Sequence, residues 1–139
     1  MAYRAWRICP AQRELAPLAF DHVSSWNKLS KAIAQCEHKR RHPHDIAPAR
    51  SCQCGFYGFK RFSELRAMLL YYADAVFPIV VGRVALWGTV RDHTEGYRAQ
   101  FAYPQILYYG GTSAAKALVQ AVGHEYACES MPIPAEFGV

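Results

Sequence analysis

The sequence predicts one α+β domain over residues 1–139, built on a small curled sheet or an incomplete β-barrel with about three helices. Segments that alternate in character with period two occur at the start and in the middle of the chain, and segments with helical spacing separate them. The central strand contains Gly82 and Gly88, and glycines inside a strand often mark the bulges or bends of small barrels. With 139 residues, of which 52% are hydrophobic, the chain can bury one core.

The N-terminal part is expected to hold two strands and a helix. Residues 3–8 alternate with period two, and Pro10 ends this strand. Residues 14–20 are a candidate pairing strand, which Pro17 restricts to an edge of the sheet. A helix is expected over residues 26–36 because apolar side chains recur there at helical spacing. These side chains are Trp26, Leu29, Ile33 and Cys36.

The rest of the chain is expected to contain a loop, two more helices and a bent hairpin. Residues 37–50 are polar and contain two prolines, which indicates a loop. The strongest strand signal covers residues 79–90, which pair with residues 97–103 as a hairpin over residues 79–103. The other expected elements are a helix at 64–75, a turn at 92–96, a short strand at 106–109, a helix at 114–127 and a tail at 132–139 that is either loose or packs late.

Cysteines and histidines cluster between the first two expected helices, at residues 36–54. Cys52 and Cys54 form a Cys-x-Cys-Gly motif, which does not readily close on itself as a disulfide. Two thiolates from a tight turn, with one Cys and one His from upstream, can close a tetrahedral structural zinc site. A set of free thiols beside a solvated basic loop is the alternative. The candidate Zn²⁺ ligands are Cys36, Cys52, Cys54 and one of His38, His42 and His44, with His44 favoured by its place after Pro43.

The charge of the chain points to an anionic partner. The formal net charge is +5 and the pI is about 9.0, which favours a partner such as nucleic acid. No segment has the form of a signal peptide, and the longest apolar run, residues 77–82, is too short to span a bilayer. We therefore expect a cytoplasmic protein without a membrane partner, in which clustered cysteines bind metal.

Aromatic and basic side chains supply a candidate nucleic-acid site. A curled sheet that carries aromatic residues and arginines near one mouth can stack a flat base and hydrogen-bond its edge. The alternative is that Trp6 and Trp87 fill the core, which is the more frequent place of a Trp in a strand. The candidate pocket residues are Trp6, Trp87 and Tyr97, with Arg4 and Arg98 at the base edge or phosphate and Lys39, Arg40 and Arg41 on the backbone.

Signals for catalysis are weak, so an enzyme is the less favoured interpretation. The chain has no nucleophile elbow, P-loop or dinucleotide-binding glycine motif. Asp92 and His93, with Glu95 nearby, are acid/base candidates, but a turn is also the ordinary place for these residue types. An enzyme or small-molecule binder for a nucleotide-like ligand remains one alternative. A protein-interaction accessory that docks through its third helix or its tail remains another.

Several motifs of this chain occur together in one family of small proteins. They are Tyr3-Arg4-Ala5-Trp6-Arg7, Cys52-Gln53-Cys54-Gly55-Phe56-Tyr57-Gly58, Gly82-Arg83-Val84-Ala85-Leu86-Trp87-Gly88-Thr89-Val90, Gly96-Tyr97-Arg98-Ala99 and Ala102-Tyr103-Pro104. Through them, roughly half of the chain resembles a family that we associate with actinobacteria. Some of its proteins look like readers of methylated cytosine in DNA. The bent strand pair also looks like the barrel of PUA-like and SRA-like domains, which hold a modified or flipped base in an aromatic pocket.

The resemblance also bears on the metal ligands. In the family a Cys, a His shortly before Ala-Pro, and a Cys-x-Cys-Gly motif recur in this order. This order maps onto Cys36, His44, Cys52 and Cys54, and one extra residue before Ala47-Pro48 keeps His42 as an alternative. Together with the charge, the resemblance leads us to expect a zinc-stabilised module that binds DNA and recognises a methylated cytosine.

Overall fold

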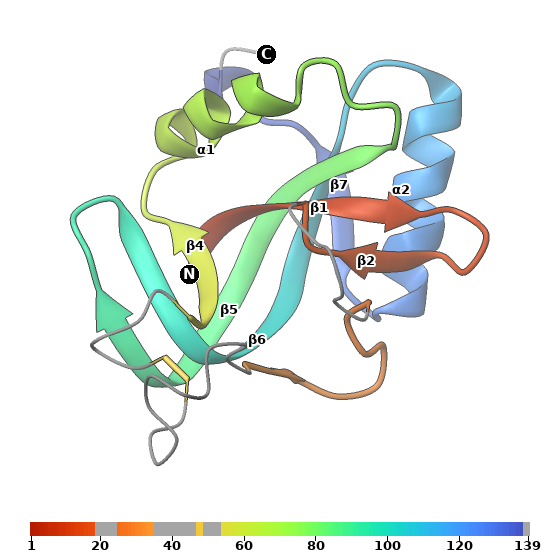
Figure 1. The fold of residues 1–139 in the computed structure, drawn as a ribbon. Helices are drawn as coiled ribbons and strands as arrows, with labels where there is room; N and C mark the ends of the chain where they lie inside the picture. The colour runs from red at the N-terminus through yellow and green to blue at the C-terminus, as the bar shows by residue number, and fades with distance from the viewer. Residues whose placement is uncertain (19–24, 35–46, 49–53, 138–139) are drawn as a thin grey trace.

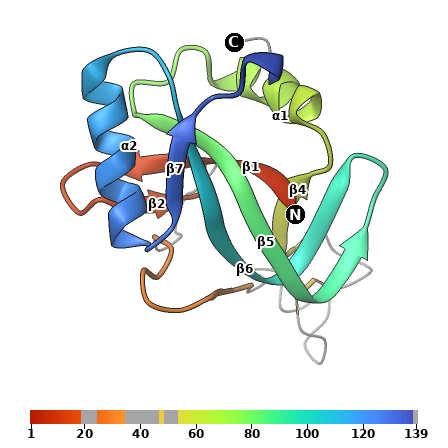
Figure 2. The same cartoon turned by 180° about the vertical axis from the view of Figure 1, so that it is seen from behind.

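A computed structural model of the chain describes residues 1–18, 25–34, 47–48 and 54–137. These residues form an α+β fold with a mixed sheet of seven strands, two α-helices and two short 3₁₀ turns (Figures 1 and 2). The strands are β1 (Ala2–Cys9), β2 (Glu14–Ala16), β3 (Ala32–Ile33), β4 (Phe56–Phe59), β5 (Ile79–Asp92), β6 (Gly96–Tyr109) and β7 (Glu129–Pro132). The helices and turns are α1 (Phe62–Leu69), η1 (Leu70–Tyr72), α2 (Ser113–Glu125) and η2 (Ala135–Phe137).

Four strands pair in a closed ring, so the expected curled sheet is a small barrel. β1 pairs with β5, β5 with β6, β6 with β4, and β4 with β1, all antiparallel. The last of these pairings consists of Tyr3 opposite Phe59 alone. β2 extends the ring beside β1, while β3 and the parallel strand β7 add to β6. The ring is therefore closed by one narrow seam.

The two long strands bend at two irregularities of their shared ladder, as the glycines predicted. Between Trp87 and Val90 the register shifts, and Gly88 adopts a φ of +79°, which an L side chain rarely adopts. Between Arg83 and Val84 the shift leaves Gln105 as an extra residue of β6. Beside this bulge, a Cβ atom at position 82 would overlap the backbone carbonyl of Ile106, so only glycine fits there.

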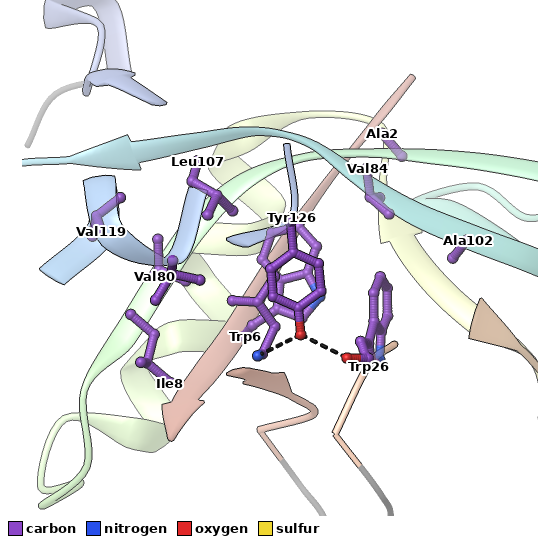
Figure 3. Close-up of a cluster of buried hydrophobic side chains, with 12 residues drawn as sticks. Ala2, Trp6, Ile8, Trp26, Val80, Val84, Ala102, Leu107, Val119 and Tyr126 are labelled. Atoms are coloured by element: carbon purple, nitrogen blue, oxygen red, sulfur yellow. Dashed lines mark hydrogen bonds between the residues drawn. The ribbon is translucent and has the colours of Figure 1, made fainter. Parts of the chain in front are cut away.

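Hydrophobic side chains cover both faces of β1, where alternate residues point to opposite sides. One face carries Trp6 and Ile8, which pack with Trp26, Val80 and α2 residues such as Val119 (Figure 3). The other face carries Ala5, which joins a second cluster with Phe62 and Leu65 of α1. In Figures 1 and 2 the tip of the β5–β6 hairpin lies at the opposite end of the molecule from α2.

The expected helix at residues 26–36 is wrong for its described part, so the described chain holds two α-helices rather than three. Asn27 Oδ1 accepts a hydrogen bond from the Leu29 backbone N–H at 2.8 Å, a local turn that competes with helix formation. The Trp26 backbone N–H donates to Leu15 O at 2.7 Å, which ties the segment to β2 instead. Ile33 belongs to the edge strand β3.

Of the two alternatives for the tail at residues 132–139, the structure shows a packed segment where it describes the tail, and not a loose one. β7 pairs parallel with the last residues of β6, including Tyr109 opposite Pro132. The ring of Phe137 stacks on Phe62 of α1 with centroids 4.1 Å apart, and its edge-to-face partners are Tyr3 and Tyr108. The C-terminal segment therefore completes the second hydrophobic cluster.

Candidate functional site

The bulge of the β5–β6 hairpin presents an exposed aromatic pair. Trp87 retains 40% of its surface exposed and lies beside Phe101, with ring centroids 5.9 Å apart at 46°. The register of the sheet aligns Ile33, Phe101 and Trp87 across β3, β6 and β5. The Lys31 ammonium lies 5.0 Å from the centre of the Phe101 ring. These three aligned side chains, the Trp87 row, combine flat apolar rings with the Lys31 cation at one edge of the sheet.

Trp6 and Tyr97, the other predicted stacking residues, do not join Trp87. Trp6 has no exposed surface and meets Trp26 edge to face at 5.5 Å, so its ring fills the core and offers no face to a base. Tyr97 packs partly against the same core, and the Lys60 ammonium lies 5.0 Å from its ring centre. The structure thus confirms the core interpretation for Trp6 and places Trp87 at the surface.

Two arginines lie directly opposite each other on the hairpin. Arg98 is only 6% exposed, and Arg91 is its register partner on β5. Arg98 Nη1 donates to Cys54 O at 3.0 Å, and Arg91 Nε donates to Pro48 O at 3.1 Å. A Cβ atom at Gly55, whose φ is +110°, would lie 2.8 Å from Pro48 Cβ. The arginine pair therefore holds the backbone on both sides of residues 49–53.

The predicted metal site lies mostly outside the described residues. Cys36, His44 and Cys52, and the alternative His42, belong to the parts of the chain left undescribed, as do Lys39, Arg40 and Arg41. Cys54 is described, is half-buried, and packs beside Ala47. In the described ranges no group of three His, Cys, Asp or Glu side chains gathers as a metal site.

Arg4 points into the first hydrophobic cluster from β1. Its Nη1 donates to Tyr57 O at 2.9 Å, and its guanidinium carbon lies 4.8 Å from the centre of the Trp26 ring. Burial lowers the pKa of the Arg4 guanidinium to about 10, so the group still carries its charge at neutral pH. Its buried Nε has no hydrogen-bond partner among the described residues, and the same holds for the indole N–H groups of Trp6 and Trp26.

The acid/base candidates at the hairpin turn point to different partners. Lys60 Nζ lies 2.6 Å from Asp92 Oδ1, and this hydrogen bond raises the pKa of Lys60. His93 Nε2 accepts from Arg98 Nε at 2.8 Å, and because a guanidinium only donates, this ring nitrogen is the unprotonated one. The two side chains are therefore engaged in separate structural contacts rather than with each other.

Sequence reasoning missed Trp26 as a neighbour of Arg4, and it missed Phe101 and Lys31 as neighbours of Trp87. The spacing at residues 26–36 predicts a helix for Trp26, whereas its place beside Arg4 follows from long-range hydrogen bonds to Leu15 and Tyr126, which no local pattern predicts. Phe101 faces Trp87 only because of the register of the hairpin. The alternation of residues 97–103 predicted the strand, but which side chains it exposes depends on the bulge.

Neither helix of the described chain is both long and apolar enough to cross a membrane. Comparisons with known protein families, with curated proteins and with solved structures produced no match.

Proposed function

We propose that this domain binds nucleic acid, with DNA that carries a methylated cytosine as the preferred ligand. The observation that carries the proposal is the exposed Trp87–Phe101 pair with Lys31 at its edge. A tryptophan that is 40% exposed in a bent strand contributes less to folding than a buried one, and its flat face suits a base. Stacking on an aromatic side chain contributes about 1–3 kcal/mol per base.

The charge of the chain supports the same ligand class. The net charge of +5 attracts phosphates over the whole surface, and Lys31 is an exposed cation beside the aromatic pair. Arg91 is half-buried and uses Nε for Pro48 O, so its terminal nitrogens extend past that bond. A strand whose base stacks on Trp87 has phosphates within reach of such cations.

We also propose that Cys36, His44, Cys52 and Cys54 hold a structural Zn²⁺ ion. The support comes from the arginine pair, which ties Pro48 O and Cys54 O to the barrel and so brings Pro48 and Gly55 together. Because the backbone is already held at Pro48 and Cys54, the metal ligands lose less conformational entropy when they bind Zn²⁺. The zinc ion would then fix the basic segment at residues 39–41 relative to the hairpin.

The test is a binding titration at several salt concentrations with fluorescently labelled nucleic acids. The ligands are matched unmodified and cytosine-methylated DNA duplexes, their single strands and an RNA duplex. We expect salt-sensitive binding that prefers the methylated duplex. The variant Trp87→Ala should weaken binding about 5- to 100-fold, the equivalent of one lost stacking contact. Lys31→Gln should lower the slope of log K against log salt by about 1.

The matched control is Tyr71→Ala, which removes an aromatic ring that is 88% exposed on η1. It should bind like the wild type, and circular dichroism should show both variants folded. Absence of binding at low salt, where attraction to phosphates is strongest, would exclude the proposed function. If Trp87→Ala and Tyr71→Ala lose binding affinity equally, the base does not stack on Trp87.

A further inference from the structure

The barrel wall around Arg4 contains three buried N–H donors without a partner among the described residues. They are Arg4 Nε, Trp6 Nε1 and Trp26 Nε1. Buried polar groups of native proteins are satisfied in nine cases out of ten or more, so a cluster of three that are all donors calls for an explanation. An unsatisfied buried donor costs about 1–3 kcal/mol.

The three donors belong to residues in mutual contact. Arg4 and Trp6 are two residues apart on β1 and therefore point to the same side of the strand. The Arg4 guanidinium carbon lies 4.8 Å from the centre of the Trp26 ring, and the Trp26 and Trp6 ring centres are 5.5 Å apart. Figure 3 shows both tryptophans in this cluster together with Tyr126.

One of the three donors belongs to the Arg4 guanidinium, a charged group that lacks a counter-ion within the described chain. None of the ion pairs there involves Arg4. Its Nη1 is occupied by Tyr57 O, so the opposite edge, formed by Nε and Nη2, has no protein acceptor among the described residues. That edge is one of the two with which arginine holds both oxygens of a carboxylate or phosphate group. Arg4 as a whole is half-buried, while its Nε is fully buried.

We propose that Arg4, Trp6 and Trp26 form a binding site for a small oxyanion, a free molecule that carries a carboxylate or phosphate group. The oxyanion accepts hydrogen bonds from the Nε–Nη2 edge of Arg4 and from an indole N–H group. The aromatic rings of Trp26 and Phe56 supply an apolar wall. This site lies on the inner face of β1 and is separate from the exposed Trp87 row. Its occupation is therefore independent of the proposed nucleic-acid binding.

The indole resonances of the three tryptophans provide a direct readout. In a proton–nitrogen correlation spectrum each of Trp6, Trp26 and Trp87 has its own indole N–H signal, which Trp→Phe variants assign. The probes are inorganic phosphate, acetate and benzoate, titrated against sodium chloride of equal ionic strength. We expect at least one probe to move the Trp6 and Trp26 signals in a saturable way, to leave Trp87 in place, and to raise the thermal midpoint.

Two variants remove the donors while they keep the packing. Trp26→Phe retains a ring but lacks the N–H group, so it should bind the probe roughly tenfold more weakly. The same variant should melt at or above the wild-type temperature without probe, because it removes an orphaned donor. Arg4→Lys retains a charge but loses the two-nitrogen edge, and it should bind at least about tenfold more weakly. Arg7→Lys, on the opposite face of β1, is the matched control and should bind like the wild type.

Three results would overturn the proposal. The first is that no probe moves the Trp6 and Trp26 signals at 50-fold excess over protein, on the order of 10 mM. The second is that Trp26→Phe melts below the wild type and binds the probe unchanged. The third is that only DNA moves these signals, which would assign the phosphate to a nucleic-acid backbone. Because Trp87→Ala should leave the probe titration unchanged, failure of the oxyanion site and failure of the nucleic-acid proposal are distinguishable.

Discussion

The hydroxyl group of Tyr126 joins three distant parts of the chain, and its removal should destabilise the fold measurably. The hydroxyl accepts a hydrogen bond from the Leu15 backbone N–H at 2.9 Å and donates one to Trp26 O at 2.6 Å (Figure 3). Leu15 and Tyr126 have no exposed surface and Trp26 is 3% exposed. In Tyr126→Phe, one backbone donor and one backbone acceptor stay buried without this partner.

The size of the effect follows from those two groups. Each buried group left unsatisfied costs about 1–3 kcal/mol, and the variant saves the desolvation of the hydroxyl itself, so we expect a loss of about 3 kcal/mol. For a chain of this length such a loss lowers the thermal midpoint by roughly 10 °C. Urea unfolding followed by circular dichroism measures the free energy of unfolding directly.

The matched control is Tyr71→Phe, which removes a hydroxyl from an exposed ring on η1. It should change the free energy of unfolding by less than about 0.5 kcal/mol. If Tyr126→Phe also loses less than about 0.5 kcal/mol, the hydroxyl does not hold the Trp26 segment as described.

Three further results are expected. Burial raises the pKa of Tyr126 to about 12, whereas an unfolded tyrosine titrates near 10, so this stabilisation is complete below pH 10 and is lost as the pH rises through 12. Urea midpoints at pH 9 and 11.5 should therefore fall further in the wild type than in Tyr126→Phe, and equal falls would contradict the assignment. Gly82→Ala should lose about 3 kcal/mol or more and yield little folded protein, because its Cβ would overlap the Ile106 carbonyl. Gly110→Ala meets only the flexible Ile133 side chain and should fold; soluble, wild-type-like Gly82→Ala would refute the close approach. Purified protein should contain one zinc ion per chain by elemental analysis, a chelator should lower its melting temperature sharply, and Cys52→Ser should lack the metal. A metal-free preparation that melts at the wild-type temperature would exclude the structural zinc site.

Local sequence patterns predicted those elements in which tertiary contacts favour the same conformation as the local sequence. The alternation of residues 3–8 predicted β1, and the glycines predicted the bends of the long hairpin. The separate short strand expected at residues 106–109 is instead the end of β6, which continues through Pro104. Gln105, the next residue, forms a bulge in the ladder with β5, and bulges are among the places in a sheet where proline occurs. A bulge of this kind depends on the partner strand and is not readable from one strand alone.

Long-range contacts decided the elements that local patterns missed. The spacing of Trp26, Leu29 and Ile33 fits a helix, yet Trp26 is held by Leu15 and Tyr126, and Leu29 is exposed. Tertiary contacts here override a weak helical preference. For the candidate site, composition and alternation predicted Trp87 and Arg98 on the bent hairpin. They could not separate a core tryptophan from a surface one, because that depends on which face the bulge turns outward.

The dependence of the sheet on one strand restricts how this sequence can drift in evolution. β6 pairs with β4 at its start, with β5 along most of its length, and with β3 and β7 further on. A single inserted residue within β6 would displace the partners of several strands at once, and a slip of one residue turns side chains to the opposite face. Insertions should destabilise the fold less in the connection at residues 110–112, which follows β6 and precedes α2. Distant relatives should therefore vary in their loops while they conserve the length of this strand.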